Sequence, residues 1–269
     1  MDLEKLRAVA LDAARAGDAV IRTWTARGAA LGTERKGFGD YVTDVDRASE
    51  EAILAVLRRE APDIPVLAEE SGGQSAELVW AVDPLDGTTN FLRRYPVVGV
   101  SVGLMRHGEP VVGAVTAPYL GAGWCAAEGL GAQDAEGRPL RVRDDATGRG
   151  VASTGFPFRR PENLARYLPV LERALRDFED LRRAGAASLD LAYAAQGSFE
   201  GFFELNLGLW DIAAGALLVR EAGGVVTDWE GDATAVFRSG DIIAGAPGWH
   251  AHMLRIARET RDAATGVAP

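Results

Sequence analysis

The chain has 269 residues, of which 47% are hydrophobic and 25% charged, and its 29 Lys and Arg against 39 Asp and Glu give a formal net charge of −10. This composition excludes a disordered or fibrous chain, and the length indicates one large α/β unit or two closely packed halves. The acidic balance argues against sequence-independent binding to nucleic acid and against binding to an anionic membrane surface, and every apolar run is shorter than the ~18 residues of a membrane-spanning helix.

A few residue types indicate the cellular compartment of the protein and limit the kinds of catalytic or metal site that it can contain. Asp2, Glu4 and Asp12 stand where a signal peptide would need positive charge, so we expect a cytoplasmic protein. The single cysteine, Cys125, excludes an internal disulfide and a multi-cysteine zinc site. Because there are only three histidines, any chemistry must depend on carboxylates.

The first half of the chain predicts two helices followed by a sheet. Apolar residues recur with a helical period over 3–24 and 47–60, and the glycine-rich segment between them predicts a hairpin or a loop. Short apolar runs then predict antiparallel strands with helices on one side, at 66–68, 78–82, 97–105, 110–116 and 123–127.

From about residue 151 the pattern changes to alternating strands and helices, which is typical of an α/β half. Strands are predicted at 151–154, 199–203, 224–229 and 241–245, and helices at 162–178, 187–196, 211–222 and 247–259. We therefore divide the chain into an N-terminal α+β half, a C-terminal α/β half and a frayed tail, at 1–148, 149–262 and 263–269.

The most informative segment is an apolar strand over 78–82 that runs into two acids, Asp83 and Asp86. Pro84 and Gly87 predict a turn that brings both carboxylates to one point and leaves the backbone N–H groups of Gly87 and Thr88 available for an anion. Asp-Pro and Asp-Gly also occur in turns that only reverse the chain. Two acids, two hydroxyls and a glycine in one turn instead favour a site for a hard cation.

Acids also mark three other places. Glu69 and Glu70 follow an apolar run, either at a strand end or in an ordinary surface loop. Asp46 precedes a helix and is either a functional acid or an N-cap, and Asp211 opens another helix as a good N-cap. The small residues at 213–215 predict that this last helix packs very closely against backbone or a ligand.

In combination these segments are similar to the motifs of the inositol monophosphatase family of Mg²⁺-dependent, Li⁺-sensitive phosphatases, nearest to its bacterial inositol-1-monophosphatase branch. The resemblance covers roughly residues 5–255 and is carried by Thr43–Asp46, Glu69–Ser71, Asp83–Phe91 and Trp210–Gly224. It implies the layered α-β-α-β-α sandwich of the inositol monophosphatase and fructose-1,6-bisphosphatase type, and a homodimer.

The resemblance also implies a metal centre with two to three Mg²⁺ ions. Glu69, Asp83 and the backbone carbonyl of Leu85 would bind one ion, Asp83, Asp86 and Asp211 would bind a second, and a weaker third ion would lie near Glu69. Independently of the resemblance, oxygen-only ligation without histidine is what Mg²⁺ prefers.

For catalysis, the resemblance implies that Thr88 and Asp46 orient and deprotonate a water molecule activated by the ion on Glu69. The N–H groups of Gly87 and Thr88 would hold the phosphate of a small phosphorylated polyol.

The hydroxyls of that polyol would be bound by Asp86, the backbone around Ala187 and Glu204, although Glu204 is alternatively an exposed acid on an edge strand. Gly208 stands three residues before Asp211, where related sequences often have histidine or a basic residue, and this departure affects the substrate more than the reaction.

The expected activity is hydrolysis of inositol-1-phosphate. Within the family the alternatives are 3′(2′),5′-bisphosphate nucleotidase, fructose-1,6-bisphosphatase and histidinol-phosphate phosphatase. An alternative of another class is a binding partner of RNA-polymerase antitermination complexes, which would use surface pairs such as Arg159-Arg160 or Arg182-Arg183.

Overall fold

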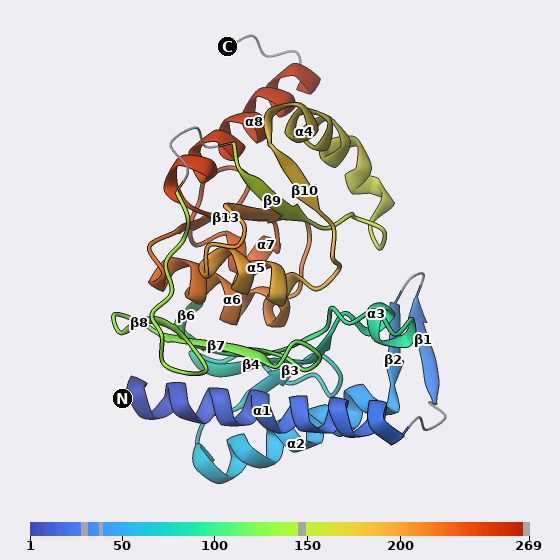
Figure 1. The fold of residues 1–269 in the computed structure, drawn as a ribbon, viewed down its shortest axis with the longest axis vertical. Helices are drawn as coiled ribbons and strands as arrows, with labels where there is room; N and C mark the ends of the chain where they lie inside the picture. Colours follow the sequence, from blue (N-terminus) through green and yellow to red (C-terminus); the bar gives the residue numbers. More distant parts are fainter. Residues whose placement is uncertain (28–31, 38–39, 145–148, 266–269) are drawn as a thin grey trace.

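The computed structural model describes residues 1–27, 32–37, 40–144 and 149–265, which form alternating layers of helix and sheet. Figure 1 shows α1 and α2 below a six-stranded sheet, then α5 and α6, then a five-stranded sheet, and α4 and α8 above it. The predicted α-β-α-β-α sandwich is confirmed.

The first layer comprises two helices and the antiparallel hairpin between them: α1 (Leu3–Arg27), β1 (Thr33–Gly37), β2 (Asp40–Thr43) and α2 (Asp44–Glu60). The hairpin alternative is thereby confirmed, although Gly28 and Gly39 of the glycine-rich segment lie outside the described residues. The two helices approach closely at Gly17, where a Cβ would lie 2.6 Å from the hydroxyl of Ser49.

The second layer is the sheet β3-β4-β5-β6-β7-β8, in which only β3 and β4 among these described strands run parallel to each other. Its strands are β3 (Val66–Ala68), β4 (Leu78–Asp86), β5 (Gly99–Arg106), β6 (Glu109–Ala117), β7 (Ala122–Ala127) and β8 (Gly131–Asp134). The prediction of helices on one side was wrong, because α1 and α2 cover one face and α6 covers the other. Accordingly β5 is buried at successive residues, as expected of a strand covered on both faces.

Helix α6 (Leu209–Glu221) lies so close to this sheet that only small residues fit between them. A Cβ on Gly103 of β5 would lie 2.8 Å from the Cβ of Ala213, and one on Gly113 of β6 would lie 2.7 Å from the carbonyl oxygen of Ala214. The close packing inferred from the small residues of this helix is confirmed, and it is packing against backbone.

The remaining elements build the outer layers. The second sheet has the order β10-β9-β11-β13-β12, with β9 parallel to β10 and β11 and β13 antiparallel to β11 and β12. Its strands are β9 (Val151–Thr154), β10 (Asp180–Arg182), β11 (Gly201–Glu204), β12 (Val225–Thr227) and β13 (Ile242–Gly245). The other helices are α3 (Thr88–Leu92), the 3₁₀ turn η1 (Pro161–Asn163), α4 (Leu164–Asp177), α5 (Ala187–Ala195), α7 (Val236–Ser239) and α8 (Pro247–Thr265).

The two predicted halves meet in a shared core. The first large sheet uses residues 66–134 and the second uses 151–245, while α6 of the second half packs on the first sheet. The proposed boundary at 148 falls in 145–148, outside the described residues, and α8 extends to Thr265, three residues into the predicted tail. Throughout the described ranges, no helix is both long and apolar enough to cross a membrane.

Candidate active site

A cavity of about 790 Å³ opens where the end of β4 faces the start of α6 and the segment after β9. Its first wall comes from the N-terminal half: Glu69, Asp83, Leu85, Asp86 and the segment 87–90. Its second wall comes from the C-terminal half: the segment 155–160, Arg183, Gly185, Ala187, the segment 204–208, Trp210 and Asp211. Of the predicted site residues, only Asp46 does not line the cavity, and none of the three histidines does.

The end of β4 is shaped so that its two acids reach this cavity. The pairing of β4 with β5 is irregular between Asp83 and Asp86, and Gly87 follows with a left-handed φ of 90° before α3 begins. The Leu85 N–H donates to Asp83 Oδ1 at 3.0 Å. The irregular register replaces strict alternation, so both carboxylates lie on the same side of the sheet edge.

The four acids predicted to bind metal interact electrostatically. Burial raises the pKa of Asp83 well above its ordinary value, and the charges of Glu69, Asp86 and Asp211 raise it further, together with a hydrogen bond to the Glu69 carboxyl. Burial, and then the charge of Asp211, raise the pKa of Asp86 to about 7. These carboxylates are therefore close enough to repel one another, and either protons or cations must compensate their charge.

The donor set fits a hard cation, because it consists of carboxylates and the Leu85 carbonyl. As the side chains stand, no three Asp, Glu, His or Cys residues of the described ranges are arranged to hold an ion. Hydrogen bonds within the chain occupy part of the donor set: Asp86 Oδ2 accepts from Ser188 and Asp211 Oδ2 accepts from the Gly208 N–H. The metal ligands thus stay a prediction supported by composition and location.

Thr88 and Asp46 form the predicted pair. The Thr88 hydroxyl lies 2.9 Å from Asp46 Oδ1 and 3.2 Å from the Leu85 carbonyl oxygen, and it can donate to one of them at a time. Asp46 Oδ2 accepts from the backbone and hydroxyl of Thr43 at 2.9 and 2.5 Å. Burial raises the pKa of Asp46. Because Asp46 is fully buried behind Thr88, it reaches the cavity only through that hydroxyl.

Asp46 and Asp211 occupy equivalent positions in their helices. Neither is the N-cap that the sequence suggested, because α2 is capped by Thr43 and α6 by Gly208. Each aspartate is instead the third residue of its helix and accepts the N–H of the capping residue, at 2.9 Å in α2 and 2.7 Å in α6. A residue in the first turn thereby has a fixed side chain and interacts favourably with the helix dipole.

The start of α5 meets the end of β4 through Ser188, which sequence reasoning missed. Its N–H and its hydroxyl both donate to Asp86 Oδ2, at 2.7 and 2.6 Å. Ala187 lines the cavity as predicted, but the next N–H along the chain is bound to Asp86 and cannot also bind a substrate hydroxyl. The signal for Ser188 was its position beside Ala187, at a helix start that the resemblance already placed near substrate.

Three of the four arginines predicted as surface pairs are exposed and also form part of the second wall, whereas Arg182 lies outside the cavity. Arg159, Arg160 and Arg183 all line the cavity. The guanidinium carbon of Arg183 lies 5.4 and 5.3 Å from the ring centres of Phe156 and Phe158. Cation–π contacts of this kind hold a guanidinium in place without neutralising its charge.

Glu204 lies at the end of β11 and faces the same cavity, which disfavours its interpretation as an exposed edge-strand acid. Burial raises its pKa to about 8, although the positive charges of Arg183 and Arg159 act in the opposite direction. Its carboxylate packs on Gly155, where a Cβ would lie 2.0 Å from it. Position 155 must therefore be glycine for Glu204 to keep this place.

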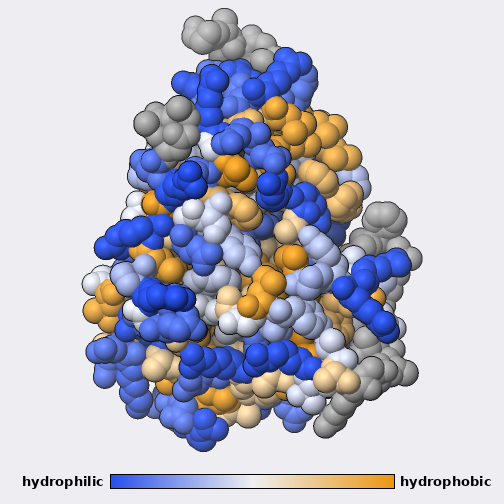
Figure 2. All heavy atoms as spheres, viewed as in Figure 1, coloured by the Kyte–Doolittle hydropathy of each residue, from blue (hydrophilic) through white to orange (hydrophobic). Residues whose placement is uncertain are grey.

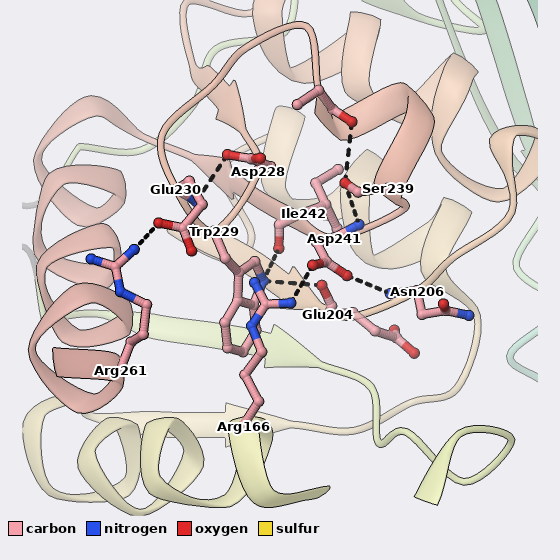
Figure 3. Close-up of polar contacts among 11 residues, drawn as sticks. Arg166, Glu204, Asn206, Asp228, Trp229, Glu230, Ser239, Asp241, Ile242 and Arg261 are labelled. Atoms are coloured by element: carbon pink, nitrogen blue, oxygen red, sulfur yellow. Dashed lines mark hydrogen bonds and ion pairs between the residues drawn. The ribbon is translucent and has the colours of Figure 1, made fainter. Parts of the chain in front are cut away.

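The loop after Glu204 is fixed by a polar network around Asp241 (Figure 3). Asp241 accepts from the Asn206 N–H at 3.0 Å and from Arg166 at 2.5 Å, and the Trp229 indole N–H lies 3.1 Å from the Glu204 carbonyl oxygen. In Figure 3 the Glu204 side chain points away from Trp229. The network thus holds the backbone between Glu204 and the start of α6 while leaving the carboxylate to the cavity.

Comparison with known proteins agrees with this fold and site. The profile described as "Inositol monophosphatase family" matches residues 2–263. The chain is 41% identical over 243 residues to "Nus factor SuhB" of Pasteurella multocida, covering 89% of this chain and 90% of that protein.

Two solved structures extend the comparison. The extragenic suppressor protein suhB from Bartonella henselae has a TM-score of 0.87 at 37% identity, covering 94% of this chain and 98% of that one. The inositol monophosphatase from Anabaena (Nostoc) has a TM-score of 0.82 at 33% identity, covering 96% and 97%. The chain belongs to the inositol monophosphatase family, whose members are phosphatases of small phosphorylated substrates and generally depend on Mg²⁺.

Proposed function

We propose that this protein is a Mg²⁺-dependent phosphomonoesterase that hydrolyses inositol-1-phosphate to inositol and phosphate. The observation that carries the proposal is that Glu69, Asp83, Asp86 and Asp211 line one cavity beside the hydrogen-bonded pair of Thr88 and Asp46; burial and the other three acids accordingly raise the pKa of Asp83. Acids placed together at such a cost in repulsion are typical of a cation site.

The metal ligands would be Glu69, Asp83, the Leu85 carbonyl, Asp86 and Asp211. Two to three Mg²⁺ ions bound there would supply an activated water and would neutralise charge on the phosphate and on the leaving oxygen. Glu69 and Asp83 already share a hydrogen bond, so one proton must leave this pair when a cation enters.

Thr88 and Asp46 orient the attacking water. When the Thr88 hydroxyl donates to Asp46 Oδ1, its oxygen lone pairs can accept a hydrogen from water in the cavity. Thr88 then receives the water proton as Asp46 receives that of Thr88, which leaves hydroxide to attack phosphorus. The N–H groups of Gly87 and Thr88, at the start of α3, bind the phosphate oxygens.

The organic half of the substrate would contact the second wall and Asp86 of the first. Glu204 and Asp86 accept hydrogen bonds from hydroxyls, and Ala187 supplies backbone contact. With a pKa of about 8, Glu204 is mostly protonated at neutral pH and can also donate. A neutral polyol suits this wall because hydroxyls both donate and accept.

The test is a substrate panel with purified protein. We expect phosphate release from inositol-1-phosphate with Mg²⁺, none with EDTA, and inhibition by Li⁺. Faster release from an adenosine bisphosphate, fructose-1,6-bisphosphate or histidinol phosphate would replace the named substrate but keep the reaction. The absence of Mg²⁺-dependent release from every phosphomonoester would contradict the proposed reaction.

A second candidate function follows from the names of the relatives. Proteins called "Nus factor SuhB" are 40–41% identical to this chain, and a comparable role in transcription would depend on surfaces and not on metal. The variant Asp83→Asn separates the two functions. We expect it to fold and to lose hydrolysis; unchanged cellular function in a strain carrying it would favour the binding role.

The homodimer implied by the resemblance stays a prediction, and one surface suits it. An apolar groove of about 420 Å³ is lined by residues 156–158, Pro161 and four residues of α4. Figure 2 shows an apolar patch over α4, where Leu164 and Leu168 are exposed. We expect a second copy of the chain to bury this patch, which sedimentation of wild type against Leu168→Glu would test.

A further inference from the structure

Three buried polar residues share one face of α2. Ser49 and Glu50 follow Asp46 by three and four residues, a spacing that places each of them on the same side of the helix as Asp46. Their exposed fractions are 0%, 0% and 5%, so each must find hydrogen-bond partners inside the protein. One of these partners, Thr88, lines the cavity, and three others, Pro84, Glu70 and Ser71, are sequence neighbours of first-wall residues.

The hydrogen bonds of these three residues connect α2 to the end of β4, which carries Asp83 and Asp86, and to the turn after β3, which carries Glu69. Asp46 accepts from Thr88, and the Ser49 hydroxyl donates to the Pro84 carbonyl oxygen at 2.7 Å. Glu50 uses its two carboxylate oxygens separately: Oε2 accepts the Glu70 N–H and Oε1 accepts the Ser71 N–H, both at 3.0 Å.

Glu50 therefore holds the turn that presents Glu69. This turn is closed by reciprocal hydrogen bonds between Ala68 and Gly72, of 2.9 and 3.0 Å, and the Glu69 N–H donates to the Val82 carbonyl oxygen of β4 at 3.0 Å. The next two N–H groups are those that Glu50 accepts. With three successive N–H groups fixed, the Cα of Glu69 has one position relative to Asp83.

The carboxylate of Glu50 does not itself line the cavity. A further buried negative charge beside four cavity acids is electrostatically unfavourable, so it is retained only where hydrogen bonds stabilise it. The N–H groups of Glu70 and Ser71 provide those hydrogen bonds. If position 50 held a residue with fewer than two suitably placed acceptor oxygens, one of these N–H groups would lose its acceptor.

We propose that Glu50 is a positioning residue for the cation site: by fixing the backbone at Glu70 and Ser71 it sets the place of Glu69 and hence the affinity for Mg²⁺. The inference rests on the proposed function, because that function assigns Glu69 to the metal. Residues that orient metal ligands in this way typically change affinity or activity by about 10–100-fold when altered.

The test compares Glu50→Gln with Glu51→Gln in the full chain. Glutamine keeps the shape of Glu50 but offers one acceptor, and its NH₂ group faces an N–H donor. Glu51 is the exposed neighbour on the same helix and controls for loss of one negative charge. Mg²⁺ affinity is measured by titration calorimetry and by the Mg²⁺-induced rise in Tm.

We expect Glu50→Gln to raise the Kd for Mg²⁺ about tenfold and to raise the Mg²⁺ requirement of hydrolysis equally, with kcat at saturating Mg²⁺ within about twofold of wild type. Glu51→Gln should bind Mg²⁺ as wild type does. A wild-type Kd in Glu50→Gln, or a lower kcat at every Mg²⁺ concentration without a change in Kd, would overturn the inference.

Glu50→Asp separates position from charge and also serves if Glu50→Gln does not fold. Aspartate keeps the charge but is too short to accept both N–H groups, so we expect a raised Kd here as well. A wild-type Kd in Glu50→Asp would overturn the inference. If wild type binds Mg²⁺ without hydrolysing any phosphomonoester, the proposed function fails while these binding measurements still decide the role of Glu50.

Discussion

The two walls of the cavity are built differently. In the first wall, the acids at the ends of β3 and β4 are supported from behind by buried hydrogen bonds from α2, such as that between Asp46 and Thr88. In the second wall, Arg159, Arg160 and Arg183 are exposed, and Arg183 is held by aromatic rings. A rigid wall suits the reacting phosphate, whereas an exposed wall can change with the substrate without altering the reaction.

The largest effect should come from the first wall, at Thr88. Thr88→Ala removes the hydroxyl between Asp46 and the cavity, and we expect kcat to fall about 10²–10³-fold with KM little changed. Steady-state kinetics at saturating Mg²⁺ checks this. Thr88→Ser keeps the hydroxyl and should retain activity within about tenfold of wild type. If Thr88→Ala were nearly as active as wild type, the proposed route of the proton through this pair would be wrong.

An intermediate effect should appear in the pH dependence of the stability of the metal-free protein. Both walls contribute to it, through Asp86 and Glu204 respectively. The pKa values of Asp86 and Glu204, about 7 and about 8, lie above the ordinary values near 4. The folded chain therefore binds more protons than the unfolded chain, and stability must fall as pH rises through these values. In EDTA we expect Tm to fall by about 5–10 °C between pH 6.5 and 8.5.

The same measurement with Mg²⁺ supplies the control. Cations replace the protons of the first wall, so the Mg²⁺-induced rise in Tm should grow with pH. Burial lowers the pKa of His250 from its ordinary value of 6.5 to about 4. Between these two pH values the unfolded chain binds the extra proton, so stability rises with pH there. The measurements therefore begin at pH 6.5, above this opposite effect. A Tm in EDTA that does not change from pH 6.5 to 8.5 would show that burial and mutual repulsion do not raise the pKa values of these acids.

The smallest effect should come from the second wall. Arg183→Ala removes a guanidinium from the cavity, and we expect KM to rise about fivefold, equivalent to about 1 kcal/mol for an exposed charge, with kcat nearly unchanged. Arg182→Ala is the matched control, because Arg182 pairs with Asp180 outside the cavity. Equal effects of the two substitutions would mean that Arg183 acts only through the net charge.

The difference between the walls also explains how much could be predicted from sequence. The acids of the first wall, and Asp211 of the second, were found because each lies at a strand end or in the first turn of a helix, where short motifs indicate a site. The resemblance supplied their expected roles. Four short elements were missed, β8, β10, α3 and α7, because polar residues occupy at least half of each and leave no apolar run to indicate it.

The residues that hold the site could not be found in this way. Glu50 is one acid among several on an amphipathic helix, Ser188 is an ordinary residue at a helix start, and Gly155 looks like any turn glycine. Each acquires its role from a partner far along the chain: Glu70, Asp86 and Glu204 respectively.

The sequence by itself determined the family, because contiguous motifs carry the resemblance, and the resemblance in turn implied the layered fold and the candidate acids. The tertiary structure decided which side chains face one cavity, bringing the exposed Arg159 and Arg183 to its second wall and enclosing Asp46 behind Thr88. Hydrogen bonds, burial and shifted pKa values arise between segments that only folding brings together, and a linear pattern cannot express them.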